Sequence, residues 1–238
     1  MTSQLRSGAD AAAAYRTVQG RVDALLRGRS EVADRRVPAC PAWSIRQTVS
    51  HLTGTAQDIV SLNLDNAGTD AWTQAQLDRL ADHSLDELLA LWAATTNPVA
   101  DLLTQSPKLI AAQAVFDGLT HEHDIRGALG EPGSRTGDPA FAVAAGFPTT
   151  MVDRAIRRNA NPCLTLTTPT TGTTQLGDPA TAPGQIAIEL SDFEALRAFG
   201  GRRSTPQLLA MPWQGDAGAL LPIFHRAAVR PPANDLSE

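Results

Sequence analysis

The chain has 238 residues, of which 42% are hydrophobic and 19% charged, and its formal net charge is −5. This is the composition of a globular protein long enough to bury a sizeable core, and the acidic balance without any Lys/Arg-rich run argues against nucleic acid as a partner. The sequence contains no run of about 18 apolar residues and no charged-then-apolar leader, so we expect no signal peptide, no membrane partner and a cytoplasmic location.

The first two thirds of the chain have the apolar periodicity of amphipathic helices. Ser44 stands at the expected N-cap of one helix, and Ser84 with Glu87 forms a capping box at the start of another. Gly130 is a suitable C-cap for the helix that follows Ser106-Pro107. Helices are therefore predicted over residues 7–26, 45–60, 73–81, 84–103, 107–129 and 138–158, the last of which Pro148 can kink or interrupt. Such helices, joined by short loops, predict an up-down bundle.

The composition changes after Asn159. Apolar and β-branched residues alternate over 162–168 and 184–190, which predicts strands, and Ser191 is placed to begin a further helix. The fold class is therefore predicted as α+β. Its predicted parts are a helical bundle over 1–159, a small strand-plus-helix domain over 160–230 and a disordered tail over 231–238.

The residues best suited to hold a metal ion are Asp117 and His121. On a helix, residues four apart share one face with Cβ atoms roughly 5–6 Å apart, and a carboxylate with an imidazole suits zinc or another first-row ion. His51 is the candidate third ligand. Alternatively, the pair lies on a solvated helix face and His51 is a histidine at the edge of the core with a carbonyl partner. His123 points about 200° away from His121, so we place it, with Glu122, on the surface.

The two cysteines, Cys40 and Cys163, do not point to a metal or redox site. They are far apart in sequence and match no zinc-binding or redox spacing. We expect both to be free thiols in a reducing compartment, and we assign neither as a nucleophile.

Three stretches of the sequence resemble one known family. The first is Val37-Pro38-Ala39-Cys40-Pro41-Ala42-Trp43-Ser44-Ile45-Arg46, followed by His51-Leu52. The second is His121-Glu122-His123-Asp124-Ile125-Arg126-Gly127-Ala128-Leu129-Gly130, and the third runs from Phe193 to Ser204, with Gln207, Trp213 and Gly215-Asp216 beyond it. These motifs resemble the mycothiol-dependent maleylpyruvate isomerase family. Its members are DinB-like metal-binding four-helix bundles with a C-terminal domain similar to sterol carrier protein.

The resemblance implies a set of site residues. His51, Asp117 and His121 occupy the positions of the family's metal ligands, although the family usually has Glu in place of Asp117. The implied cofactors are a divalent metal, zinc above all, and mycothiol, a small thiol of actinobacteria. Because guanidinium pairs bidentately with carboxylates, we assign Arg79 and Arg202 as catalytic residues and Arg202 and Arg203 as cofactor-binding residues. Asp124 and Arg126 are interpreted as a surface pair outside the site.

The resemblance implies an enzyme in which a metal-activated thiolate attacks a small electrophilic substrate, as a cis–trans isomerase or an S-transferase. Two alternatives remain open. One is a thiol-independent metalloenzyme on the same scaffold, and the other is a non-catalytic protein that binds a small ligand and keeps a vestigial metal site. The sequence names neither the substrate nor the oligomeric state.

Overall fold

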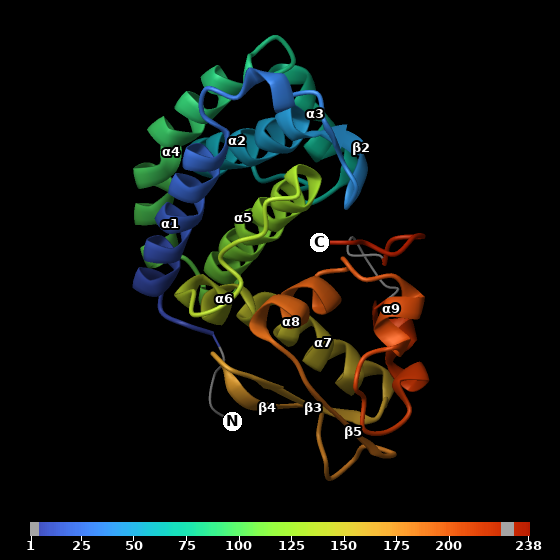
Figure 1. Cartoon of the computed structure of the whole chain (residues 1–238). Coiled ribbons are helices and arrows are strands. Elements are labelled where there is room, and N and C mark those ends of the chain that lie inside the picture. Colours follow the sequence, from blue (N-terminus) through green and yellow to red (C-terminus); the bar gives the residue numbers. More distant parts are fainter. Residues whose placement is uncertain (1–4, 225–230) are drawn as a thin grey trace.

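The computed structural model describes residues 5–224 and 231–238. Its first part is a bundle of long helices that pack on one another (Figure 1). They are α1 (Gly8–Leu26), α2 (Ile45–Ser61), α4 (Leu85–Gln105) and α5 (Lys108–Leu129), with the shorter α3 (Asp70–Arg79) against α2. Ser7, Ser44 and Ser84 cap α1, α2 and α4, and α5 ends at Gly130, whose φ of 71° is left-handed. The local signals therefore placed these helices correctly.

A short hairpin leads into α2. It pairs β1 (Arg36–Val37) with β2 (Cys40–Ser44) in antiparallel fashion, after the 3-10 turn η1 (Ser30–Val32). Because Ser44 is both the last residue of β2 and the N-cap of α2, the hairpin fixes where this helix begins. It also holds Cys40 and Trp43 near the end of the bundle that carries the candidate ligands.

The second part contains a three-stranded sheet with helices against it. Its strands are β3 (Cys163–Thr168), β4 (Gly172–Leu176) and β5 (Gln185–Glu189), in the order β4-β3-β5. The central strand β3 is antiparallel to β4 and parallel to β5. The helical elements are α6 (Pro139–Ala144), α7 (Gly146–Asn159), α8 (Asp192–Phe199), α9 (Thr205–Leu209), η2 (Ala217–Leu220) and α10 (Leu221–Phe224). This arrangement confirms the predicted α+β class.

The helix predicted over 138–158, with Pro148 as a residue able to interrupt it, is divided into two helices, α6 and α7, which meet at Ala145. Pro148 lies in the first turn of α7, where a missing N–H breaks no helical hydrogen bond, whereas it would break one in the interior of a continuous helix. The proline is therefore accommodated by a break in the helix.

The buried apolar side chains form two clusters. The first fills the bundle and contains residues such as Leu26, Val49 and Leu119. The second joins the sheet to α7 and α8 through the set Val152, Ile156, Leu164, Leu166, Ile186, Ile188 and Phe199. The domain boundary near residue 160 stays a prediction, since α7 lies before it and yet contributes its buried side chains to the second cluster.

Residues 231–238 differ from the disordered tail that the sequence predicted. Leu236 is 9% exposed, and the side chain of Glu238 is 5% exposed and paired with Arg197 and Arg203. Buried arginines need carboxylate partners, and this requirement orders a segment that has no apolar periodicity of its own. Among the described residues, no helix has both the length and the apolar character needed to cross a bilayer.

Candidate metal centre

His51, Asp117 and His121 converge between α2 and α5. Asp117 lies one turn before His121 on α5, and its carboxylate faces both imidazoles. His51 Nε2 is 3.5 Å from Asp117 Oδ2, and His121 Nε2 is 3.6 Å from Asp117 Oδ1. One ligand atom from each residue lies within 4.8 Å of the others. The structure thus brings together the three residues that the sequence selected.

The spacing of these atoms fits a divalent ion. Two ligands bound to a tetrahedral zinc, each at about 2.0–2.1 Å, lie about 3.4 Å apart. The measured separations of 3.5 and 3.6 Å are close to that value. Although Asp117 is one methylene shorter than the Glu of the family pattern, one of its oxygens faces each histidine. Two imidazoles and a carboxylate are also the donor set that zinc and other first-row ions accept.

The Nδ1 atom of His51 is held by the side chain of Gln76. Gln76 Oε1 lies 2.9 Å from Nδ1, and Gln76 Nε2 donates to Asp58 Oδ2 over 2.8 Å. Because the amide NH₂ is committed to Asp58, its oxygen must accept, and His51 Nδ1 must donate. The Nε2 lone pair of the neutral His51 therefore points toward Asp117, as a metal ligand requires.

The Nδ1 atom of His121 is held by a carboxylate. Asp124 Oδ2 lies 3.0 Å from Nδ1, and Asp124 is 1% exposed. Burial raises the pKa of Asp124, but Arg202 and Arg197 outweigh burial and keep this pKa well below its usual value. The group is therefore an anion that can only accept, so His121 Nδ1 donates to it and Nε2 is left for a metal.

The charge of Asp117 dominates the electrostatics between the two histidines. Burial lowers the pKa of His51, but the carboxylate of Asp117 more than reverses this effect and leaves the pKa above its ordinary value. Without a cation, the carboxylate of Asp117 therefore favours a proton on His51. Binding of a metal would release that proton, as is usual when histidine becomes a ligand.

One side of the centre is covered and one side is open. The indole of Trp43 lies over both imidazoles, with ring centroids 5.2 Å from His51 and 5.9 Å from His121. The two histidine side chains are 9% and 8% exposed, whereas the Asp117 side chain is 32% exposed. Solvent therefore reaches the centre past Asp117.

The three predicted arginines lie at different places. Arg202 is beside the centre, where its guanidinium pairs with Asp124 at 2.9 Å. Burial raises the pKa of Asp117, but the charges of His51, His121 and Arg202 together bring it below its ordinary value. Arg203 pairs with Glu194 and Glu238.

Arg79 is separated from the centre by two side chains. It pairs with Asp58 at 3.0 Å and donates to the carbonyl of Gly54, and Asp58 in turn accepts from Gln76, the partner of His51. The structure therefore brings Arg202 to the candidate ligands directly, and connects Arg79 to them only through Asp58 and Gln76.

Cys40 lies next to the centre but is a poor nucleophile. Its Sγ is 3.6 Å from Asp124 Oδ2 and 3.5 Å from Arg202 Nη2. Burial, followed by the charge of Asp124, raises the pKa of this thiol to about 12. Cys40 also forms a second possible ligand group with His121 and Asp124, but there it competes for the carboxylate that holds His121. Both cysteines are free.

The prediction that Glu122 and His123 lie on the surface is wrong. They are 0% and 2% exposed, because every residue of α5 from Gly118 to Ile125 is buried. The helix packs against α1, α2, α6 and α7, and this stretch of it has no solvent face. Glu122 pairs with Arg21 and Arg126, and the ring of His123 packs against Phe141 and Phe193.

Sequence reasoning also missed the residues that hold the histidines. Asp124 was interpreted as a surface residue, and it is instead the buried acceptor for His121. The available signal was its position three residues after His121, on the same side of the helix. Gln76 gave no such signal, since it lies on another helix and its role depends on how α3 packs against α2.

Comparison with known proteins agrees with this geometry. The sequence model of the mycothiol maleylpyruvate isomerase N-terminal domain matches residues 15–129, which include His51, Asp117 and His121. Residues 15–129 are therefore similar to the N-terminal domain of that family. The match confirms the resemblance that the sequence motifs indicated. No curated protein matches the chain.

Two solved structures share the fold of this chain. They are crystal structures of the mycothiol-dependent maleylpyruvate isomerase, one of them of a variant with a histidine replaced by alanine. Each aligns with a TM-score of 0.58 and 14% sequence identity over 85% of this chain and 92% of the other. The likeness therefore extends beyond the bundle into the C-terminal part, and at this identity it establishes the fold.

Proposed function

We propose that the protein is a divalent-metal-dependent enzyme that uses mycothiol to attack a small electrophilic substrate, as a cis–trans isomerase or an S-transferase. The observation that carries this proposal is the convergence of His51, Asp117 and His121, with both Nδ1 atoms held by acceptors and both Nε2 atoms facing one carboxylate. Similarity to the mycothiol maleylpyruvate isomerase N-terminal domain supports the choice of thiol.

The three converging residues would hold the ion, for which we propose zinc. When bound, a divalent cation lowers the pKa of a thiol and so supplies a thiolate at neutral pH. The thiol must come from outside the chain, because the pKa of Cys40 is raised to about 12 and Cys163 is fully buried. Mycothiol meets this need, and a cytoplasmic location would keep it reduced.

Arg202 is the arginine that we propose for holding an acidic group of substrate or cofactor, because its guanidinium lies beside the candidate ligands. Arg203 would contribute to the cofactor site only by exchanging one of its two carboxylate partners, Glu194 or Glu238. For Arg79 we propose a positioning role, since it holds Asp58, which orients Gln76 against His51.

Turnover assays with and without thiol test the proposal. The zinc-loaded protein would be given maleylpyruvate and a panel of small electrophiles, with mycothiol, with another thiol and with none, and the ultraviolet spectrum of each mixture would be followed. We expect turnover that requires mycothiol and is lost in His51→Ala. Thiol-independent turnover would identify a metalloenzyme that uses water instead. A protein that turns over nothing and takes up no metal would be a ligand-binding protein.

A further inference from the structure

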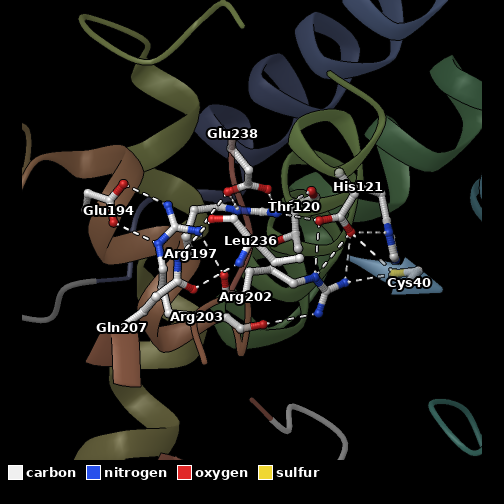
Figure 2. Close-up of polar contacts among 12 residues, drawn as sticks. Cys40, Thr120, His121, Glu194, Arg197, Arg202, Arg203, Gln207, Leu236 and Glu238 are labelled. Carbon is white, nitrogen blue, oxygen red and sulfur yellow. Dashed lines mark hydrogen bonds and ion pairs between the residues drawn. The ribbon is translucent and has the colours of Figure 1, made fainter. Parts of the chain in front are cut away.

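The segment 231–238 is bound by side chains of the C-terminal part (Figure 2). The side chain of Gln207 donates to the carbonyl of Leu236 over 2.9 Å and accepts from its N–H over 3.3 Å. Ser204 donates to Asp235. Gln207 thus forms the two hydrogen bonds that a neighbouring β-strand would form, one with the carbonyl and one with the N–H of Leu236.

This binding places the carboxylate of Glu238 between two buried arginines. Arg197 donates through Nε over 3.0 Å and also through Nη2, and Arg203 donates through Nη1 over 2.7 Å. The side chains of Arg197, Arg203 and Glu238 are 0%, 7% and 5% exposed. Ion pairs this deeply buried cannot exchange their partners for water without a large cost.

Arg197 connects this ion pair to the candidate metal centre. Its Nη2 is 2.7 Å from Asp124 Oδ1, and its Nη1 donates to the carbonyl of Thr120 over 3.1 Å. The other oxygen of Asp124 accepts from His121 Nδ1. A continuous set of charge-assisted hydrogen bonds therefore runs from Glu238 through Arg197 and Asp124 to His121.

The charges in this cluster balance only when Glu238 is included. Arg197, Arg202 and Arg203 are matched by the carboxylates of Asp124, Glu194 and Glu238. Without Glu238, Arg197 would depend on Asp124 as its anionic partner. Asp124 would then balance the full charge of both Arg197 and Arg202. A carboxylate that is paired this strongly with two arginines is a weaker acceptor for the N–H of an imidazole.

We propose that Glu238 is a positioning residue for the metal centre, which it supports by sharing Arg197 with Asp124 and so keeping Asp124 a strong acceptor for His121 Nδ1–H. The inference rests on the proposed metal site. A ligating imidazole binds metal more tightly when its second nitrogen donates to a strong, fixed acceptor. Glu238 therefore raises metal affinity, although it lies three side chains from the ligand atom.

Metal affinity of charge-neutral variants tests this proposal. Zinc affinity would be measured by competition with a chromophoric chelator for the wild type, Glu238→Gln, Glu238→Asp and Glu194→Gln. Loss of a direct partner of a ligand lowers affinity about 10–100-fold, and we expect Glu238→Gln, two steps further out, to lower it about 3–10-fold. Glu194→Gln is the matched control, because Glu194 also pairs with Arg203 but has no bond to Arg197 among those found in the described residues. It should bind zinc as the wild type does, and Glu238→Asp should restore part of the affinity.

A double variant shows whether Glu238 acts through Asp124. In an Asp124→Asn background, Glu238→Gln should have no further effect on zinc affinity, since the acceptor that it supports is gone. Equal losses in Glu238→Gln and Glu194→Gln, or no loss in Glu238→Gln, would overturn the proposal.

The Nδ1–H proton of His121 gives a readout that needs no metal. Its NMR resonance in the metal-free protein should move in Glu238→Gln and stay in place in Glu194→Gln. If the wild type binds no zinc, the proposed function fails, and this resonance still decides whether Glu238 acts on His121. An unchanged resonance in Glu238→Gln would contradict the coupling whatever the metal result.

Discussion

The two histidines of the candidate metal centre, His51 and His121, are held by different kinds of acceptor. Each histidine must present Nε2 to the centre, so each needs an acceptor for Nδ1–H. For His51 the acceptor is the neutral amide of Gln76, and the carboxylate that holds this amide, Asp58, lies one step further away. For His121 the acceptor is itself a buried carboxylate, Asp124, which is paired with two arginines.

The difference shows how each half of the site depends on the rest of the chain. The support of His51 is complete within α2 and α3, both inside the family match over 15–129. The support of His121 reaches out of that range, to Arg197 on α8, Arg202 beyond it and Glu238 in the segment 231–238. The bundle therefore carries all the candidate ligands and both acceptors, whereas the arginines that hold Asp124 lie outside it.

The largest effect is expected from Asp124→Asn, which removes the carboxylate that holds His121. It leaves Arg197 and Arg202 buried beside a neutral amide, and removal of one partner from a buried ion pair costs about 3–5 kcal/mol of unfolding free energy. Zinc affinity should fall about 10–100-fold as His121 loses its acceptor. Urea unfolding and chelator competition measure the two effects.

Asp101→Asn provides the control for that variant. Asp101 also pairs with an arginine, Arg16, but its side chain is 76% exposed. Pairs of this kind contribute little, about 0–1 kcal/mol, so both stability and zinc affinity should stay close to those of the wild type. Equal behaviour of the two variants would mean that the arginines around Asp124 are not tied to it in solution.

A smaller effect is expected from Gln76→Leu, which removes the neutral amide that holds His51. The variant removes the acceptor of His51 Nδ1–H but leaves Asp58 paired with Arg79, so no buried charge loses its partner. We expect a loss of about 1–3 kcal/mol of stability and about a tenfold loss of zinc affinity. Gln74→Leu, on the exposed side of the same helix, should change neither. If Gln76→Leu destabilised the protein more than Asp124→Asn, the contrast between the two acceptors would be wrong.

The smallest effect is expected at His123, whose protonated form is disfavoured by burial and by nearby arginines. Among the described residues, neither ring nitrogen has a hydrogen-bond partner, and burial, then the charges of Arg197 and other arginines, lowers the pKa of His123 to about 3. At neutral pH, His123→Met removes two unsatisfied buried atoms and should stabilise the protein by about 1 kcal/mol.

Acid unfolding provides a second readout for the same variant. The unfolded chain takes up a proton at His123 below its ordinary pKa of 6.5, while the folded chain does so only near pH 3. The wild type therefore loses stability at His123 as the pH falls from about 6.5, by up to about 1.4 kcal/mol per pH unit. The variant should lack this contribution. A variant that is as sensitive to pH as the wild type would show that His123 is not held neutral.

The features that could be predicted from the sequence are local, whereas the features that were missed depend on contacts between distant parts of the chain. The helix caps at Ser44 and Ser84 and the ligand pair Asp117 and His121 are local patterns, so they were visible without the fold. Glu122 and His123 were misplaced because the sequence of one helix does not reveal that neighbouring elements bury every residue of its stretch from Gly118 to Ile125.

The acceptors and the C-terminal segment needed long-range packing. Gln76 meets His51 across two helices, and Glu238 meets Arg197 across 41 positions of the chain. No spacing rule connects such residues, and a polar segment without periodicity looks disordered when its partners are unknown. The arginine predictions were limited in the same way, since nothing local distinguishes Arg202, beside the centre, from Arg203, which pairs away from it.

The metal content of the purified protein tests the central claim most directly. The wild type, His51→Ala, His121→Ala and the control His83→Ala would be prepared without chelator or histidine tag, incubated with zinc, desalted and subjected to elemental analysis. The account predicts a near-stoichiometric divalent ion in the wild type and in His83→Ala, and its loss in both ligand variants. A wild type that retains no ion after incubation, or ligand variants that retain it, would contradict a metal centre built from His51, Asp117 and His121.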